Sequence, residues 1–294
     1  MARRPNRIGH AFAHSQPYEE LRALVCASIG QTFAMLYVIS PAKTLDYESP
    51  VEMSDATHPL FVEQAAELIE VLKRKSPEEI SELMSLSPAL TALNVRRFQE
   101  WRPEFSAETA RPAVLTFNGD VYEGLDARSL SRTDLDWAQE HLVILSGLYG
   151  VLRPLDLMRP YRLEMGTRLE VGRARNLYEF WGDRLAHYIS ERLQQQQGGE
   201  PILVNVASEE YFKSVRRPAL KARVIQCVFE DWKSGTYKVI SFHAKRARGL
   251  LVRFAVQNRI DQPAGLCDFN LEGYAFAAEA SDNDRLVFRR KQAG

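Results

Sequence analysis

Short, largely apolar runs separated by longer polar stretches constrain the fold of this chain most. Four such runs span residues 36–39, 113–117, 142–145 and 202–206, and turn-forming or polar residues bound them. Runs of this length that are rich in leucine, isoleucine and valine are typical of buried strands. The sequence therefore predicts a sheet whose strands are covered by other elements.

Helical signals fill much of the sequence between these runs. Apolar residues recur at helical spacing over 60–72, and Ser76-Pro77 and Ser87-Pro88 each place an N-cap serine before a proline. These three helices are expected to form one layer. The later patterns predict a short helix capped at 133–134, helices over 176–197 and 243–259, a hairpin of 224–232 with 237–242, and a last strand at 285–290.

The order of the elements favours the α+β class. Strands and helices do not alternate with the regularity of a doubly wound sheet, and no glycine-rich phosphate loop follows the first strand. No internal repeat and no linker rich in Gly or Ser divides the chain. We therefore expect a single compact domain in which helices surround a mixed sheet.

Composition limits the class of protein. Lys and Arg together number 38, as do Asp and Glu, so a surface for a polyanion requires local segregation of charge. Cys26, Cys227 and Cys267 have no metal-ligand spacing, which favours a reducing compartment without structural zinc. No run approaches the roughly 18 apolar residues that span a bilayer. We expect a soluble, cytoplasmic protein with no cofactor and no membrane contact.

Residues 1–34 are expected to be an extension in front of a domain that covers 35–294. Arginines near the start resemble a targeting peptide, but acidic residues interrupt the apolar run that a signal peptide requires. The first strand-like run begins at Met35, which an upstream start-codon assignment would explain. Residues 18–29 are compatible with a helix.

A loop lysine and a turn carboxylate are the candidates for catalysis. Lys43 follows the first strand in Ser40-Pro-Ala-Lys43, and Asp120 follows another predicted strand in Phe117-Asn-Gly-Asp120. Loops after buried strands can aim side chains into clefts, and a carboxylate beside Lys43 would hold its ammonium group or act as a general base. The alternatives are a solvated lysine and a simple Asn-Gly turn.

The segment from Leu145 to Gly166 is a candidate anion site. Its candidate residues are Gly147, Gly150, Arg153, Arg159 and Arg162. Amides of a glycine-bounded turn and nearby guanidinium groups are suited to phosphate oxygens. The turn is similar to the loop of a helix-hairpin-helix, which grips a DNA backbone without reading sequence, although its glycine spacing differs. The alternative is a network with Asp156 and Glu164 that holds a long loop together.

A second basic cluster begins the last predicted helix. Lys245, Arg246 and Arg248 lie near its start, where cations oppose the helix macrodipole. A bound anion would compensate for this, whereas pairing with Glu230 and Asp231 is the alternative.

One more cation follows a predicted strand-to-helix junction. Ser208 is expected to be an N-cap, and Lys213 lies about one turn further. The histidines show no metal-ligand spacing, so the sequence predicts no metal site.

Several blocks together resemble the signature blocks of the YaaA family of peroxide stress proteins. They span 40–46, 117–122, 145–166, 177–182, 205–213 and 244–249. The resemblance implies a cytoplasmic bacterial protein that limits damage by hydrogen peroxide, keeps free intracellular iron low and binds duplex DNA in a positively charged cleft. By that likeness the cleft would be lined by Lys43, Arg153, Arg159, Arg162, Lys213, Lys245, Arg246 and Arg248.

Three functional hypotheses follow. In the first, local cations bind the backbone of duplex DNA with little sequence specificity. In the second, the chain is a lyase-like or nucleotide-processing enzyme in which Lys43 and Asp120 act, and the basic residues hold a small anion. In the third the chain sequesters iron directly, which the lack of clustered metal ligands in the sequence disfavours.

Overall fold

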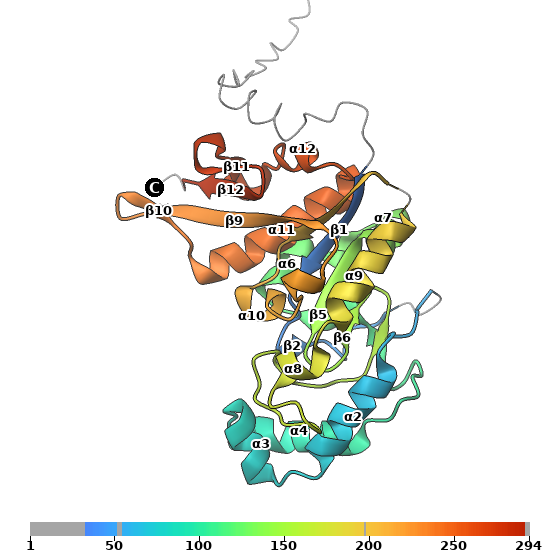
Figure 1. Ribbon diagram of the computed structural model, residues 1–294. Helices are drawn as coiled ribbons and strands as arrows, with labels where there is room; N and C mark the ends of the chain where they lie inside the picture. Colours follow the sequence, from blue (N-terminus) through green and yellow to red (C-terminus); the bar gives the residue numbers. More distant parts are fainter. Residues whose placement is uncertain (1–32, 52–54, 197, 292–294) are drawn as a thin grey trace, which may run out of the picture.

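A mixed sheet forms the centre of the protein. The structure, a computed structural model, describes residues 33–51, 55–196 and 198–291 (Figure 1). Within these residues the largest sheet has eight strands in the order β11-β12-β9-β8-β1-β5-β6, with β10 paired to β9. These strands are β1 (Phe33–Ile39), β5 (Leu142–Ser146), β6 (Gly150–Leu152), β8 (Glu200–Asn205), β9 (Arg223–Lys233), β10 (Thr236–Lys238), β11 (Ala275–Phe276) and β12 (Arg285–Arg290). The predicted α+β domain with a mixed sheet is confirmed; the predicted helix over 18–29 lies outside the described residues.

The central strands are parallel. β1 pairs in parallel with β8 over its first six residues and with β5 over its last three. β9 and β12 continue the parallel order beyond β8, whereas β6, β10 and β11 are antiparallel to their neighbours. The carboxyl ends of β1, β5 and β8 therefore lie at the same edge of the sheet.

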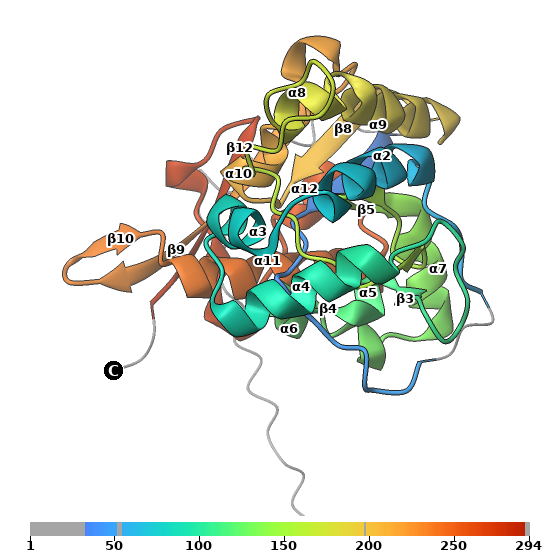
Figure 2. The same ribbon diagram turned by 90° about the horizontal axis from the view of Figure 1, so that it is seen from below.

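Helices cover both faces of the sheet. In Figure 2, α9 (Arg184–Gln195) lies on one side, and α7 (Arg132–His141) and α11 (Ser241–Asn258) lie on the other. Tyr37 of β1 points to the second side, because its ring lies 6.3 Å from that of Trp137 in α7 and its hydroxyl donates to the Ile260 carbonyl at 2.8 Å. Its strand neighbours alternate to the opposite face, so β1 is buried on both sides.

A helical layer lies beneath the sheet, at the lower end of Figure 1. It consists of α2 (Val62–Lys73), α3 (Pro77–Met84) and α4 (Pro88–Glu100). Ser76 caps α3 in a capping box: its hydroxyl accepts from the Glu79 amide at 3.2 Å, and the Glu79 carboxylate accepts from the Ser76 amide at 2.8 Å. Ser87 caps α4 in the same position. The predicted starts of both helices are confirmed.

The sequence predicts one long helix over 176–197, and this prediction is wrong because the segment forms two helices. α8 spans Leu177–Trp181 and ends at Gly182, which has φ +53°. Glycine adopts this conformation at little cost, so the chain changes direction before α9 begins. Apolar periodicity on each side of the break does not reveal it.

The predicted strand over 113–117 is also wrong. Residues Ala113–Thr116 form the helical turn α5, and the Thr116 hydroxyl donates to the Pro112 carbonyl at 2.7 Å within that turn. A short buried apolar run has the same appearance in a strand and in a helical turn. Only Phe117–Asn118 (β4) pairs, with Thr44–Leu45 (β2).

The hairpin after residue 223 is confirmed, with a shorter second strand than predicted. Ser234 and Gly235 form its turn, and both have positive φ. β10 ends at Lys238, and residues 241 and 242 already belong to α11. The remaining elements are β3 (Arg111–Pro112), β7 (Leu157–Met158), α6 (Asp120–Leu125), α10 (Glu209–Phe212), α12 (Pro263–Leu266), and the 3-10 turns η1 (Ala127–Ser129), η2 (Arg217–Ala219), η3 (Leu271–Gly273) and η4 (Ala278–Ala280).

Two glycines allow α11 to pack directly on α6. A Cβ at Gly249 would overlap the Val121 carbonyl, and a Cβ at Gly124 would overlap the Arg246 carbonyl. The two backbones therefore approach more closely than larger residues permit, and this contact packs residues 246–250 of α11 against α6. None of the helices in the described ranges combines the length and apolar character of a membrane span.

We expect Gly249→Ala to destabilise the protein by about 3 kcal/mol or more, because the added methyl has only backbone to displace. Urea unfolding monitored by circular dichroism measures the loss. Gly235→Ala is the control, since its site is open and only its positive φ opposes a side chain. An equal or smaller loss for Gly249→Ala would contradict the proposed tight contact.

Candidate functional site

A cavity of ≈ 410 Å³ lies where the loops after β1 and β8 meet. Open α/β sheets bind ligands at this position, beyond the carboxyl ends of parallel strands. We call it the α11 cavity, because α11 supplies its most basic wall. It is lined by Ser40, Pro41, Ala42, Lys43, Thr44, Asn118, Gly119, Asp120, Val121, Glu164, Ser208, Glu210, Tyr211, Lys245 and Arg248.

Two serines join the loops that form its floor. The Ser208 amide donates to the Ser40 hydroxyl at 2.8 Å, and the two hydroxyls lie 3.2 Å apart. Ser208 also caps α10, because its hydroxyl accepts from the Tyr211 amide at 3.5 Å. Tyr122 donates to the Ser40 carbonyl at 3.1 Å. The predicted N-cap at Ser208 is confirmed, and the serines serve to hold the cavity's shape.

Lys43 and Asp120 both line the cavity, but they do not pair. The Lys43 ammonium lies 2.7 Å from a Glu164 carboxylate oxygen, and 59% of the lysine side chain is exposed. Asp120 is the first residue of α6, where the helix macrodipole favours a carboxylate. The expectation that Asp120 would hold the ammonium is corrected: Glu164 holds it, and nothing in the sequence pattern indicated this residue.

Arg248 is the residue of the cavity whose environment most favours binding of an anion. Its side chain is partly buried, and burial lowers the pKa of its guanidinium group. Within the described residues it has no carboxylate partner and no hydrogen bond. Lys245, one turn earlier on α11, is exposed and equally unpaired in the part of the chain described. A partly buried cation without a counter-ion is unfavourable unless a ligand supplies the negative charge.

The three predicted arginines of the segment up to Gly166 are held in structural bonds. Arg153 pairs with Asp156 at 3.0 Å, and Arg162 pairs with Glu164 at 3.3 Å. Arg159 donates to the Glu104 carbonyl at 2.8 and 3.0 Å. None of them lines the α11 cavity. The alternative interpretation, a network that holds a long loop together, describes Arg153 and Arg162.

The predicted likeness of this turn to a helix-hairpin-helix loop is corrected, because the turn joins two strands and not two helices. Ser146 to Gly150 connects two antiparallel strands, β5 and β6, and the whole turn is buried. A Cβ at Gly147 would overlap the Leu163 carbonyl, and one at Gly150 would overlap the Trp181 ring. These glycines therefore allow close packing, and neither of them lines the α11 cavity.

Lys213 and Arg246 also lie outside the α11 cavity. The Lys213 ammonium lies 5.0 Å from the centre of the Tyr178 ring. Arg246 binds Glu272, with its shortest contact at 2.6 Å, and not Glu230 or Asp231 as the alternative prediction had it. Those two carboxylates bind the arginines at the end of β12 instead.

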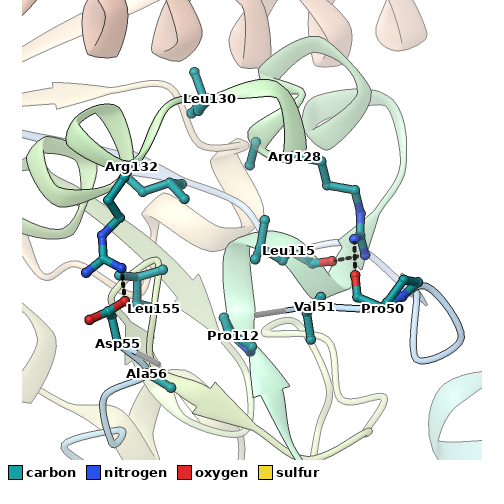
Figure 3. A pocket seen from close by; sticks show the side chains of 12 residues that line it. Pro50, Val51, Asp55, Ala56, Pro112, Leu115, Arg128, Leu130, Arg132 and Leu155 are labelled. Atoms are coloured by element: carbon teal, nitrogen blue, oxygen red, sulfur yellow. Dashed lines mark hydrogen bonds and ion pairs between the residues drawn. The ribbon is translucent and has the colours of Figure 1, made fainter. Parts of the chain in front are cut away.

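Figure 3 shows a second cavity, of ≈ 270 Å³, whose arginines are also occupied. Arg128 donates to the carbonyls of Pro50 and Leu115 at 3.1 and 2.9 Å. Arg132 forms an ion pair with Asp55. These cations have internal partners, so this cavity is a weaker candidate for an anion.

Comparison with known sequences identifies the family. The model of the family described as "Peroxide stress protein YaaA" matches residues 35–280. This chain belongs to the YaaA family. The fold and the α11 cavity described above are therefore features of a YaaA-family chain.

Close relatives extend along the same region. UPF0246 proteins of Bordetella petrii and Bordetella pertussis are 63% and 62% identical over 257 and 259 residues, or 87% and 88% of this chain and 100% of theirs. A UPF0246 protein of Paracidovorax citrulli is 60% identical over 261 residues, with 88% of this chain and 100% of its own covered.

One thiol of this YaaA-family chain is poorly suited to react with peroxide. Cys227 is buried, and burial raises the pKa of its thiol well above its ordinary value. Peroxide reacts with the thiolate, so a buried thiol of raised pKa is inert.

We expect the stability contribution of Asp46, which anchors the loop that carries Lys43, to depend on pH. Hydrogen bonds from Ser49 lower the pKa of Asp46 to about 2 from 3.8. A lowered native pKa means that the carboxylate stabilises the fold above pH 3.8 and that this contribution is lost as the pH falls toward 2. Asp46→Asn should therefore lower the urea midpoint at neutral pH and leave it unchanged at acid pH.

Urea unfolding of both proteins across the acid range measures this difference. Glu67→Gln, at an exposed position of α2, is the matched control and should show no such trend. A deficit of Asp46→Asn that stays constant at every pH would contradict the assignment.

Proposed function

We propose that this protein acts in the response to peroxide by binding the phosphate backbone of duplex DNA at the α11 cavity, without sequence specificity. The observation that carries the proposal is Arg248, a partly buried guanidinium group that faces the cavity without a carboxylate partner among the described residues. Arginine forms paired, charge-assisted hydrogen bonds with phosphate oxygens. A phosphate is therefore a ligand that restores the missing negative charge.

A second cation of α11 supports the same ligand. Lys245, one turn before Arg248, lines the same cavity, whereas the first turn of the helix does not. Two cations on one wall of a cavity favour an anion over a neutral ligand.

Ion pairs within the protein reduce the number of cations that can bind phosphate, and so reduce the expected salt dependence of DNA binding. Of the cavity's cations, Lys43 is neutralised by Glu164, which leaves Lys245 and Arg248 without a carboxylate within the described ranges. Each phosphate contact contributes about −0.9 to the slope of log affinity against log salt, so a slope of about −2 is expected from these two. A larger value would require contacts beyond the cavity.

We propose that the lowering of free intracellular iron, which the family resemblance implies, follows indirectly from this binding. The α11 cavity is lined by carboxylates as well as cations, but no cluster of His, Cys, Asp and Glu in the described part of the chain is arranged to hold a metal ion. A variant that loses DNA binding should then also lose the effect on iron in cells.

Catalysis by Lys43 is a second candidate, and it is favoured by the presence of Lys43 and Asp120 in the same cavity. Lys43 forms an ion pair with Glu164, which would have to break before the lysine nitrogen could act as a nucleophile. Borohydride trapping of an adduct with damaged DNA or a nucleotide, lost in Lys43→Arg, would favour this candidate over simple binding.

We expect Arg248→Gln to weaken binding to a short duplex by about tenfold or more, because the variant removes the charge that the phosphate neutralises. Fluorescence anisotropy across a salt series measures both the affinity and the slope. Arg285→Gln is the matched control, because Arg285 is exposed at the amino end of β12, the opposite edge of the sheet. Equal affinity of the Arg248→Gln and control proteins would overturn the proposal.

A further inference from the structure

A smaller cavity of ≈ 220 Å³ lies beside the helical layer, on α4 and the segment that follows β7. No residue of the α11 cavity lines it. We call it the Arg97 cavity. It is lined by Tyr47, Arg97, Glu100, Trp101, Glu108, Thr109, Arg159 and Pro160.

Arg97 has an unusual environment for an arginine. Its side chain is partly buried, and the described residues offer it neither an ion pair nor a hydrogen bond. Burial lowers the pKa of its guanidinium group, and the charges of Arg96 and Arg162 lower it further. Tyr47 acts in the opposite direction and raises this pKa.

The neighbouring arginines leave the positive charge largely uncompensated. Arg159 donates to the Glu104 carbonyl, which is neutral. The buried Nε of Arg162 has no hydrogen-bond partner, and its carboxylate partner, Glu164, is shared with Lys43. Glu164 is thus the carboxylate partner of both Lys43 and Arg162. Among the described contacts, Arg97 and Arg159 form no ion pair with a carboxylate.

The other lining groups are consistent with a small oxyanion. Glu100 and Glu108 are exposed, and neither forms an ion pair with Arg97 or Arg159 among the described contacts. Tyr47 donates its hydroxyl to the Met158 carbonyl at 2.6 Å, so its ring acts as a wall of the cavity. The Thr109 hydroxyl is held by Ser106, since it accepts from the Ser106 amide at 3.2 Å.

We infer that the Arg97 cavity is a second anion site, in which Arg97 and Arg159 bind one phosphate group. Arg97 makes no hydrogen bond within the described residues and can donate a pair to a tetrahedral oxyanion, while Arg159 can donate from Nη1, which its bonds to the Glu104 carbonyl leave free. The site stands apart from the proposed function, because its cations belong to α4 and to the loop after β7 and not to α11. Lys43 and Glu164 line the α11 cavity and not this one.

Binding of inorganic phosphate and pyrophosphate to the full-length protein tests the site. Isothermal titration measures the affinity, and the fluorescence of Trp101, which lines the cavity, reports on its occupancy. Arg97→Gln should weaken pyrophosphate binding by about tenfold or more. Arg96→Gln is the matched control, because Arg96 is the next residue of α4 but lines the groove between α3 and α4. It should change the affinity by less than about twofold.

Two further variants keep the result interpretable. Arg159→Gln should have the same effect as Arg97→Gln, so loss of folding in one of them leaves the other as a test. Arg285→Gln, outside both cavities, should leave pyrophosphate binding unchanged, whereas Arg248→Gln should remove only the share of binding that belongs to the α11 cavity. The inference is overturned if Arg97→Gln and Arg159→Gln bind pyrophosphate like wild type, if only Arg248→Gln loses binding, or if wild type shows no saturable binding.

Competition with a short duplex distinguishes two sources of the phosphate group. If the duplex displaces pyrophosphate and Arg97→Gln also weakens DNA binding, the site takes a backbone phosphate. If the duplex has no effect while Arg97→Gln abolishes pyrophosphate binding, the site takes a free phosphorylated molecule. Both results support an anion site at Arg97.

Discussion

The pairing of β1 with parallel strands on both of its edges is the constraint on which the rest of the structure depends. β1 lies between β5 and β8, and Leu36, Val38 and Ile39 are fully buried. Burial of each such side chain stabilises the fold by about 1.5–3 kcal/mol. Because all three strands run in the same direction, the loops after β1 and β8 must leave the sheet together. The bonds between Ser40 and Ser208 then close the floor of the α11 cavity.

Most of the basic residues that suggest a DNA-binding cleft in the sequence are used to hold the fold together. Long loops leave carbonyl groups and carboxylates that need donors, and arginine has enough donors to satisfy several of them. Arg153 holds the buried Asp156, Arg159 holds the Glu104 carbonyl, and Arg246 holds Glu272. A basic sequence segment is therefore not the same as a basic surface. Net positive charge remains where these partners are lacking, at Arg248 and at Arg97.

Glu164 connects the two candidate anion sites. Its carboxylate lies 2.7 Å from Lys43 on one side and 3.3 Å from Arg162 on the other. Glu164 therefore reduces the repulsion between Lys43 and Arg162. It forms no ion pair with Arg248 or Arg97 among the described contacts. A chain whose net charge is zero can in this way present two local sites for phosphate, one in each cavity.

The sequence by itself determined the features that depend on neighbouring residues. Serine caps before α3 and α4, the glycine turn of the β9–β10 hairpin, the mixed α+β class and the family blocks all follow from local patterns. Local patterns failed where the same apolar pattern is compatible with two conformations. Residues 113–116 form a helical turn and not a strand, and a break at Gly182 divides what reads as one helix. Lys43 and Asp120 both line the α11 cavity, but local patterns did not indicate which residue pairs with Lys43. Only the tertiary structure decided that Lys43 binds Glu164 and that Arg248 has no such partner within the described chain, because ion pairing depends on how segments far apart in sequence are brought together.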